Sequence, residues 1–446
     1  MSAHLRRNIA LPIALAATMG MALAGCTTAA PTSGSGVKQT SVVNIYGPWS
    51  GTEAKEIEAT YASWASANKI TVHYSGDANF SQNIATKIQG NAVPDIAFFP
   101  QPGLLDAAIK TGKVVATDSA TQANVNKNWS KDWQNYITVG GKLYGTPLDA
   151  NVKGYVWYSP AEFAKLGVKV PTSYADLLSL TATVQQKTGA APWCAGFSSG
   201  QASGWPGADW LADMVLRTAG PSSYDDWVSG KVKFTDPKIT TALNQLGKIL
   251  VEPTYVNAGF GNVSSINATA FGDVAAPLAS GKCLMTHQAN FLEASFATVK
   301  TASGGTPTVG PNGDVWAFML PPVTAGGGES VTGGGDFAAA FNSNSATTKL
   351  MNYLSSSAWA NKLVGAKGSS FISANKGADA NLVSDPLLKS ATKTLTSSST
   401  TFRFGADDLM PAAVEDAFWK GMVDWVNGSS VSSVQSAIQA SWATAG

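Results

Sequence analysis

The fold is decided early in the chain, where three short apolar runs read VVNIYGPWS (42–50), ITVHY (70–74) and DIAFFP (95–100). The runs are rich in Val, Ile, Tyr and Phe, and two of them close with Gly or Pro, a pattern that predicts strands. A helical face of Ile57, Tyr61 and Trp64 separates the first two runs, and an amphipathic stretch over 80–89 precedes the third. Because strands alternate with helices, the sequence predicts an α/β fold built on a parallel sheet.

The ends of these strands are the first candidate ligand positions. Ligands of open α/β sheets bind outside the carboxyl ends of the strands. The first run is followed by Gly47-Pro48-Trp49-Ser50, and the third by Pro100-Gln101-Pro102-Gly103. Trp49 and Gln101 are therefore candidate contacts.

The middle of the chain is predicted to be rich in helices. Three helix starts carry a capping residue: Ser159 before Pro160 and Glu162, Ser173 before Asp176, and Asp236 before Pro237. Short strands are predicted around Cys283–His287 and over Trp316–Leu320. The glycine-rich segment Ala325–Asp336 lacks the Gly-Lys-Ser/Thr ending of a phosphate loop. It suits a chain crossing between domains, or backbone close to a ligand.

One aromatic stretch, Pro192–Tyr224, has the composition of a sugar site. It contains three tryptophans and two aspartates: Trp193, Trp205, Trp210, Asp209 and Asp213. Aromatic rings cover the apolar faces of a pyranose, and carboxylates accept hydrogen bonds from its hydroxyl groups. The alternative is helix packing, because Trp210, Met214 and Arg217 are spaced as neighbours on one helix.

Composition excludes several function classes. The chain has 446 residues, enough for two domains, and only 13% are charged, with a formal net charge of +1. No basic patch stands out, which argues against nucleic acid as a partner. There is no zinc or EF-hand signature, and a Ser-His-Asp triad would have to use His73 or His287. His287 has no second ligand at metal spacing, so we expect a ligand contact or a capping role there.

The N-terminus has the pattern of an export signal. Arg6 and Arg7 precede an apolar run over 9–23, which ends in Leu23-Ala24-Gly25-Cys26. A membrane anchor is the competing interpretation, but the run is short and contains Pro and Gly. Leu-Ala-Gly-Cys resembles the bacterial lipobox, which implies a signal peptide over 1–25 and a lipid on the Cys26 sulfur. Residues 26–40 then form a flexible tether.

The other two cysteines are predicted to pair. Cys194 and Cys283 form an even pair in an oxidising compartment. Their disulfide would close a loop of roughly 90 residues, which contributes about 4–5 kcal/mol in the loop-entropy treatment. Two separate buried thiols are the alternative.

Taken together, the chain resembles the solute-binding proteins of bacterial ABC importers, and most of all their α-glucoside-binding members. The resemblance covers nearly all of the chain after the tether. It rests on the lipobox, on Pro147-Leu148-Asp149-Ala150-Asn151, and on further short motifs in a fixed order: 192–194, 204–210, 216–221, 333–336, 371–376, 408–413 and 418–422.

The resemblance implies an α/β, two-lobed fold of the periplasmic-binding-protein type II, with a mixed sheet flanked by helices in each lobe and the ligand between them. Lobe one would comprise 41–151 and 334–387, and lobe two 152–333 and 388–446. Both lobes would be discontinuous in sequence.

Carried onto this chain, the resemblance implies three stacking rings, Trp49, Trp205 and Trp419. The polar contacts would be Asp149, Asn151, Asp336 and Arg403, followed by Gln101, Asp209, His287 and Asp408. Alternatives remain at four positions: Trp419 as a helix core residue beside Met422, Asp336 as a turn residue, Arg403 in an inter-lobe ion pair, and Asp407 and Asp408 as helix caps.

The implied function is a substrate-binding lipoprotein that captures an α-glucoside or similar disaccharide by hinge closure and delivers it to a membrane permease. We expect a monomer without catalytic activity, metal or cofactor, held by the Cys26 lipid at the outer face of the cytoplasmic membrane. The alternatives are a secreted glycoside hydrolase, which also combines aromatic rings with paired carboxylates, and a surface adhesin that binds a carbohydrate polymer.

Overall fold

The three apolar runs form the strands β1 (Ser41–Gly47), β2 (Ile70–Gly76) and β3 (Ile96–Phe99). β1 lies between the other two and pairs in parallel with both. The connections are helical, with α1 (Gly51–Ala67) after β1 and α2 (Phe80–Gln89) after β2. The predicted alternation of strands and helices is therefore confirmed.

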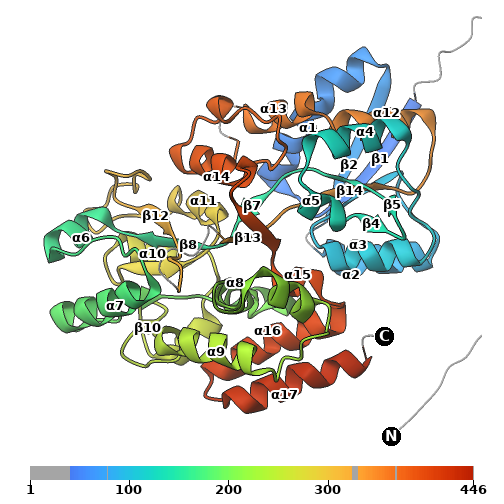
Figure 1. Cartoon of the computed structure of the whole chain (residues 1–446). Coiled ribbons are helices and arrows are strands. Elements are labelled where there is room, and N and C mark those ends of the chain that lie inside the picture. The colour runs from blue at the N-terminus through green and yellow to red at the C-terminus, as the bar shows by residue number, and fades with distance from the viewer. Residues whose placement is uncertain (1–40, 78, 324–329, 367–368, 445–446) are drawn as a thin grey trace, which may run out of the picture. The chain divides into compact units, whose positions relative to one another are not determined.

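The computed structural model describes residues 41–77, 79–323, 330–366 and 369–444 (Figure 1). The predicted signal peptide (1–25), the tether (26–40) with Cys26, and the glycines 326–328 lie outside these ranges.

The first large sheet is mixed. Its order is β2-β1-β3-β14-β6, where β14 (Phe337–Ala340) runs antiparallel to β3 and β6 (Thr146–Pro147) antiparallel to β14. A parallel sheet was predicted from the first strands, and this is right for three strands only. β14 enters from a distant part of the chain, so the local pattern carries no information about its direction.

Both faces of this sheet are buried under helices. Ile45 and Phe98 face one hydrophobic core and Ala97 and Phe99 face the other, as the alternation of side chains along a strand requires. The first core is completed by α1 and by α12 (Ser345–Leu354) and α13 (Ser357–Val364). The second is completed by α2, α3 (Pro102–Lys110), α4 (Ser119–Asn128) and α5 (Lys131–Asn135).

A second large sheet forms from the middle of the chain. Its order is β10-β9-β11-β8-β12, with bounds β8 (Tyr155–Tyr158), β9 (Trp193–Cys194), β10 (Val256–Asn257), β11 (Met285–His287) and β12 (Trp316–Met319). A disulfide joins Cys194 at the end of β9 to Cys283 just before β11, with the two Cα atoms 5.8 Å apart.

The helices around the second sheet include the long α8 (Trp205–Val228), which is kinked at Gly220. The others are α6 (Pro160–Leu166), α7 (Tyr174–Thr188), α9 (Pro237–Leu250), α10 (Ala275–Ala279), α11 (Glu293–Phe296), α15 (Ala406–Leu409), α16 (Ala412–Val426) and α17 (Val431–Ser441). The predicted caps are confirmed, since the side chains of Ser159, Ser173 and Asp236 accept hydrogen bonds from the first turns of α6, α7 and α9.

A third, small sheet collects the segments that connect the two large ones (Figure 1). β7 (Asn151–Val152) follows β6 and precedes β8, and β13 (Ser330–Gly334) follows β12 and precedes β14. β15 (Thr401–Phe404) lies between α14 (Pro386–Thr396) and α15. The order is β15-β13-β7, so these connecting segments are hydrogen-bonded to one another.

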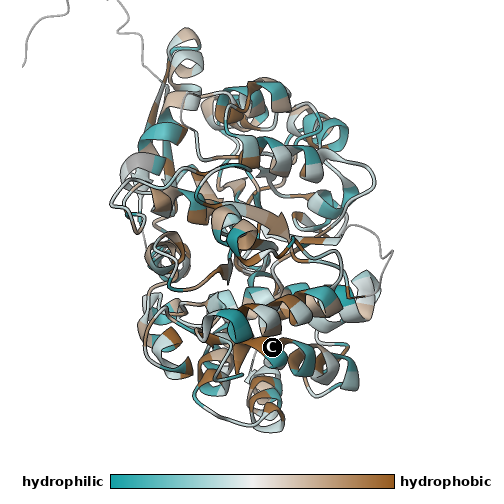
Figure 2. Ribbon diagram, turned by 90° about the vertical axis from the view of Figure 1, so that its left-hand side faces the viewer, coloured by the Kyte–Doolittle hydropathy of each residue, from teal (hydrophilic) through white to brown (hydrophobic). Residues whose placement is uncertain are grey.

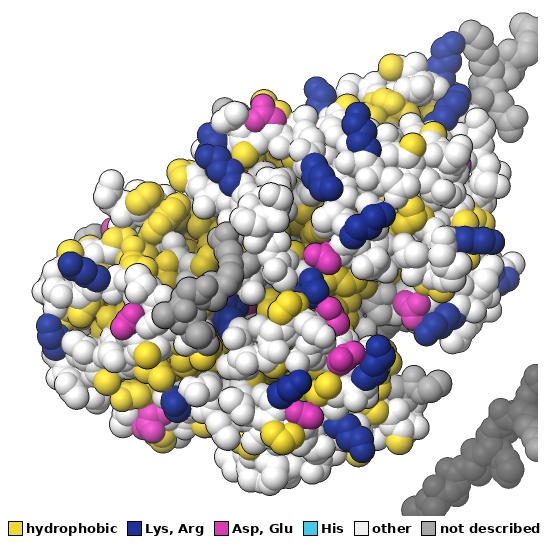
Figure 3. All heavy atoms as spheres, in the orientation of Figure 1, with side chains coloured by type: hydrophobic (Ala, Val, Ile, Leu, Met, Phe, Trp, Pro, Cys, Tyr) yellow, Lys and Arg dark blue, Asp and Glu magenta, His cyan; other side chains and the backbone are white. Residues whose placement is uncertain are grey.

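A two-stranded hairpin, β4 (Thr138–Val139) and β5 (Lys142–Leu143), completes the strands of the described residues. Hydrophobic residues lie along the inner strands and inward helix faces, and hydrophilic residues lie on the outer helices (Figure 2). Lys and Arg side chains are scattered singly over the face shown in Figure 3. Among the described helices, none combines the length and apolarity that a membrane crossing needs.

Candidate functional site

Two cavities lie where residues of both large sheets and their helices meet. Cavity 1, of about 1300 Å³, is lined among others by Ser81, Gln82, Gln101, Gln201, Glu415 and Trp419. Cavity 2, of about 820 Å³, is lined among others by Trp49, Asp149, Asn151, Phe291, Asp336 and Phe371. Six of the eleven predicted ligand contacts therefore line one cavity or the other.

Trp49 forms part of the floor of cavity 2, directly after β1. Its indole ring makes edge-to-face contacts with the rings of Phe98 and Phe371, at centroid distances of 5.5 and 5.2 Å. Its backbone N–H donates to the Tyr74 hydroxyl at 3.0 Å, and its side chain is 8% exposed. The ring is thus fixed in orientation while still reaching the cavity, which suits a stacking platform.

Asp149 and Asp336 form a buried carboxyl pair in cavity 2. The Asp336 amide donates to Asp149 Oδ1 at 2.7 Å. Gly335 makes this possible, because its φ is +157° and a Cβ there would lie 2.4 Å from the Asp149 carbonyl oxygen. Burial raises the pKa of Asp149 to about 6. Burial, followed by the charge of Asp149, raises the pKa of Asp336 well above its usual range.

Cavity 2 contains polar atoms that no protein group satisfies. Asp336 Oδ1 and Asn151 Oδ1 are buried without a hydrogen-bond partner. Glu293 Oε2, on another lining residue, is also unpaired. Buried polar atoms are nearly always paired, so these three orphaned oxygens indicate the place of a ligand's donor groups.

The opposite wall of cavity 2 comes from the second sheet's side. It is formed by Asn290 and Phe291 in the 3-10 turn Asn290–Leu292 and by Glu293, the first residue of α11. Trp205, the first residue of α8, lies behind this wall. Its ring contacts Phe271 and Phe291 at centroid distances of 5.0 and 5.9 Å. Trp205 is outside the lining of both cavities and contacts Phe291, which lines cavity 2.

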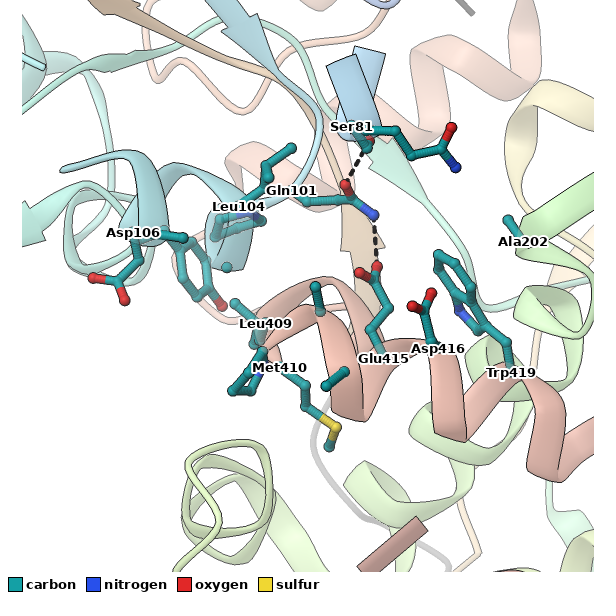
Figure 4. Close-up of a pocket in the computed structure, with 18 of the residues that line it drawn as sticks. Ser81, Gln101, Leu104, Asp106, Ala202, Leu409, Met410, Glu415, Asp416 and Trp419 are labelled. Atoms are coloured by element: carbon teal, nitrogen blue, oxygen red, sulfur yellow. Dashed lines mark hydrogen bonds between the residues drawn. The ribbon is translucent and has the colours of Figure 1, made fainter. Parts of the chain in front are cut away.

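A chain of hydrogen bonds crosses cavity 1 from Ser81 through Gln101 to Glu415 (Figure 4). Ser81 donates to Gln101 Oε1 at 2.9 Å, and Gln101 Nε2 donates to Glu415 on α16 at 2.5 Å. Gln82 donates to Gln201 across the same gap. These bonds connect the first sheet's helices to elements packed on the second sheet.

Trp419 lies on α16 at the edge of cavity 1. Its Nε1 donates to Asp407 Oδ2 at 2.7 Å. Trp419 is only partly buried, whereas Met422 on the same helix is fully buried. The carbonyl of Trp419 would lie 2.1 Å from a Cβ at Gly204, whose φ is +109°. Glycine at this position allows the start of α8 to pack against α16.

Asp209 and Asp408 are held by a buried lysine. Lys153 Nζ bonds Asp209 Oδ1 and Asp408 Oδ2, both at 2.8 Å, and the three side chains are 10%, 3% and 14% exposed. Burial alone would lower the pKa of Lys153, but the two carboxylates raise it well above its ordinary value. Neither aspartate lines cavity 1 or cavity 2.

Arg403 and His287 also lie outside both linings. Arg403 makes a two-pronged ion pair with Asp225 on α8, at 2.6 and 2.9 Å, and lies 3.5 Å from Asp132 on α5. Sequence reasoning left an inter-lobe ion pair as the alternative for Arg403. Only the contact with Asp132 joins the two predicted lobes, because Asp225 and Arg403 both fall within predicted lobe two. His287 is stacked on Trp210, with centroids 4.9 Å apart, and its Nε2 lies 3.3 Å from Asp213 Oδ2.

Sequence reasoning missed two residues that line cavity 2, Phe291 and Phe371, and also Lys153, which lies outside both linings and holds Asp209 and Asp408. Lys153 carries the only charge in the otherwise uncharged run Asn151–Tyr158. A buried lysine is nearly always paired, so this position could have been recognised as one that forms an ion pair with buried carboxylates. Phe291 and Phe371 follow no periodic pattern, so no sequence signal distinguishes them. Within the described residues, no group of three or more His, Cys, Asp and Glu side chains is arranged to hold a metal ion.

Comparison with known proteins identifies the family. The profile of the family "Bacterial extracellular solute-binding protein" matches residues 51–361. The chain is 33% identical over 404 residues to the "Osmoprotective compounds-binding protein GgtB" of Synechocystis sp., covering 90% of this chain and 92% of that protein. It is 32% identical over 412 residues to the "Alpha-glucosides-binding periplasmic protein AglE" of Rhizobium meliloti, covering 90% and 86%.

Solved structures agree on the fold. The bacterial solute receptor AcbH superimposes with a TM-score of 0.73 at 18% sequence identity, covering 91% of this chain and 99% of that chain. The two-lobed periplasmic-binding fold predicted from the sequence is confirmed. The matched profile and both relatives lead to one conclusion: the chain belongs to the bacterial extracellular solute-binding proteins.

Proposed function

We propose that this chain is the substrate-binding component of an ABC sugar importer, and that it captures an α-glucoside or a similar disaccharide in cavity 2. The observation that carries the proposal is the lining of that cavity, where a fixed indole lies beside two orphaned acceptors, Asp336 Oδ1 and Asn151 Oδ1. A sugar presents both an apolar ring face and several hydroxyl donors, so it matches this lining.

The size of cavity 2 and the relatives support the same ligand class. A volume of about 820 Å³ lies within the usual range for small-molecule sites. One relative is named for α-glucosides and another for osmoprotective compounds. Cavity 1 is the weaker candidate, because Gln101 and Glu415, and Gln82 and Gln201, already bond to each other, and no buried unpaired polar atom belongs to its described lining.

Capture would follow from the geometry of cavity 2. Trp49 and Asp336 reach it from the side of the first sheet, and Phe291 reaches it from the side of the second. A ligand that contacts both sides stabilises the arrangement in which they are close. In cavity 1, the Gln101–Glu415 hydrogen bond would add to the same closed arrangement. We expect a permease to bind this closed form.

The experiment is a thermal-shift and calorimetry screen of the purified protein against trehalose, sucrose, maltose and non-sugar osmolytes. At least one disaccharide is expected to bind at micromolar affinity, which corresponds to about −8 kcal/mol, without being hydrolysed. If only a non-sugar solute raises the melting temperature, the sugar assignment is wrong. Release of monosaccharide would instead show a glycoside hydrolase.

The choice between the cavities has its own test. Trp49→Leu is expected to weaken binding of the best disaccharide at least about ten-fold, roughly 1.4 kcal/mol. Trp419→Leu, the matched control in cavity 1, should change affinity less than about three-fold. Circular dichroism and melting without ligand check that both variants fold. The reverse order of effects would place the ligand in cavity 1.

We also propose that the protein is anchored by lipid on Cys26, supported by the Leu23-Ala24-Gly25-Cys26 motif behind an apolar run. Cys26→Ser is expected to move the protein from the membrane fraction of the cell to the soluble or secreted fraction, whereas Thr27→Ser should leave it in place. Unchanged membrane association of Cys26→Ser would contradict the anchor.

A further inference from the structure

The lining of cavity 2 is strongly acidic. The described lining residues include no Lys, Arg or His. Six carboxyl side chains line the cavity: Glu53, Glu56, Asp149, Glu293, Asp336 and Asp385. They are distributed over both sides of the cavity, because Glu53 and Asp149 belong to the side of the first sheet and Glu293 begins α11. Like charges that share a confined space repel one another unless a cation or a proton lies between them.

Four of the six acids form two pairs, Asp149 with Asp336 and Glu293 with Asp385, and each pair presents an unsatisfied oxygen. Asp336 is 8% exposed and sits on Asp149, and its Oδ1 has no partner. Glu293 Oε2 is also buried without a partner. Burial, followed by a hydrogen bond to Asp385, raises the pKa of Glu293 to about 8. The environment therefore disfavours the bare negative charge at both pairs.

A metal ion does not explain this arrangement. No three of the described carboxylates come close enough together to form a metal site. Carboxylates that are spread around a cavity of about 820 Å³ suit a cation that is itself large and carries several donors. The aromatic lining points the same way, because Trp49, Phe291 and Phe371 can accept an organic cation against their ring faces.

We propose that cavity 2 binds the protonated amine of an amine-bearing sugar or glycoside, with the ammonium group directed at Asp336 Oδ1 and the Asp149 carboxylate. This rests on the proposed function, since the remainder of the ligand is the sugar that stacks on Trp49. An ammonium group has three donors and no acceptor, so it satisfies orphaned acceptors without creating new ones. Its hydrogen bonds to carboxylates are charge-assisted and stronger than those of a hydroxyl group.

The test compares ligands that differ in one substituent. Isothermal titration of the full chain at pH 7 would use glucose, glucosamine and N-acetylglucosamine, and the same series on trehalose: trehalose, 2-amino-2-deoxytrehalose and its N-acetyl derivative. In each series the amine is expected to bind at least ten-fold more tightly than both neutral members. The advantage should shrink as salt is raised from 20 to 500 mM, because the Debye length falls from about 20 Å to about 4 Å and screening weakens the charge interaction.

The variants locate the effect. Asp336→Asn is expected to bring the affinity ratio of amine to N-acetyl compound close to one, because it removes a charge and keeps the shape. Asp424→Asn is the control, since Asp424 pairs with Lys420 on the exposed side of α16 and lines neither cavity. It should leave the ratio unchanged. The ratio is measured within one variant, so a general loss of affinity does not imitate the result.

The outcomes separate the two proposals. If neutral sugars bind and the amines bind no better, the amine proposal is overturned while the sugar-binding proposal stands. A ratio above ten that survives Asp336→Asn would also overturn it, because the amine would then be recognised elsewhere. If none of the six compounds binds, and no disaccharide of the wider screen does, both proposals fail.

Discussion

Lys153→Met is expected to lower the free energy of unfolding by about 3–5 kcal/mol, the usual cost of removing one partner from a buried ion cluster. The substitution keeps most of the aliphatic chain, so packing changes little. It removes the cation that Asp209 and Asp408 share at 2.8 Å. Both carboxylates would then remain buried without compensation. Urea unfolding of the purified protein measures the loss.

The effect should depend on pH in a defined direction. Without Lys153, burial holds the pKa of Asp209 above its unfolded value, so the folded state binds protons more readily than the unfolded state does. The stability of the variant should therefore improve as the pH is lowered from 7 towards 5, relative to wild type. A loss that is independent of pH would show that packing and not charge is responsible.

Two controls confine the interpretation. Lys420→Met removes a lysine from an exposed ion pair with Asp424, and should cost less than about 1 kcal/mol. The triple variant Lys153→Met, Asp209→Asn, Asp408→Asn, which removes the stranded charges, should recover much of the stability. If Lys153→Met is no worse than Lys420→Met, the cluster does not stabilise the fold.

Removal of the Cys194–Cys283 disulfide is the second large effect. The bond spans a sequence separation of 89 residues, which corresponds to about 4–5 kcal/mol in the loop-entropy treatment. Both cysteines are fully buried between β9 and β11, so Ala at both positions also removes a little packing. Cys194→Ala with Cys283→Ala is expected to lower the unfolding free energy by about 2–5 kcal/mol.

Reductant distinguishes the bond from the side chains. Wild-type protein unfolded in urea with dithiothreitol should lose most of the same stability, whereas the double variant should not respond. Equal stability of wild type with and without reductant would favour two separate thiols, the alternative that the sequence left open.

The parts of the fold that could be predicted are those with a local cause. The strand at 42–46 and the capped helices follow from side-chain patterns within a few residues, and the strand-end rule pointed to Trp49 and Gln101, which line the two cavities. The strand-end rule could not show that Trp49 and Gln101 line different cavities. The cavity that each residue lines depends on which helices packed on the second sheet lie opposite it.

The candidate site was harder to predict wherever distant segments meet. Arg403 was expected to contact ligand. Instead, its guanidinium Nε and Nη2 donate to the two carboxylate oxygens of Asp225, which is 178 residues away in the sequence. Nothing near Arg403 in the sequence indicates that partner. In the aromatic stretch, Trp210 is a core residue stacked on His287, and only Trp205 reaches the wall of cavity 2 from behind. Helical spacing with Met214 marked Trp210 as a packing residue and so distinguished it from Trp205. The same spacing could not predict the contact between Trp205 and Phe291.

The small sheet of β7, β13 and β15 has a mechanical consequence. Gly333 is paired with Val152 on one side and with Phe404 on the other. The three connecting strands are therefore hydrogen-bonded into one sheet and cannot bend independently of one another. We expect this small sheet to bend as one unit about a single axis, because bending one strand alone would break its backbone hydrogen bonds to the neighbouring strands. The two lobes should therefore move with one dominant degree of freedom, and ligand capture should follow a single relaxation.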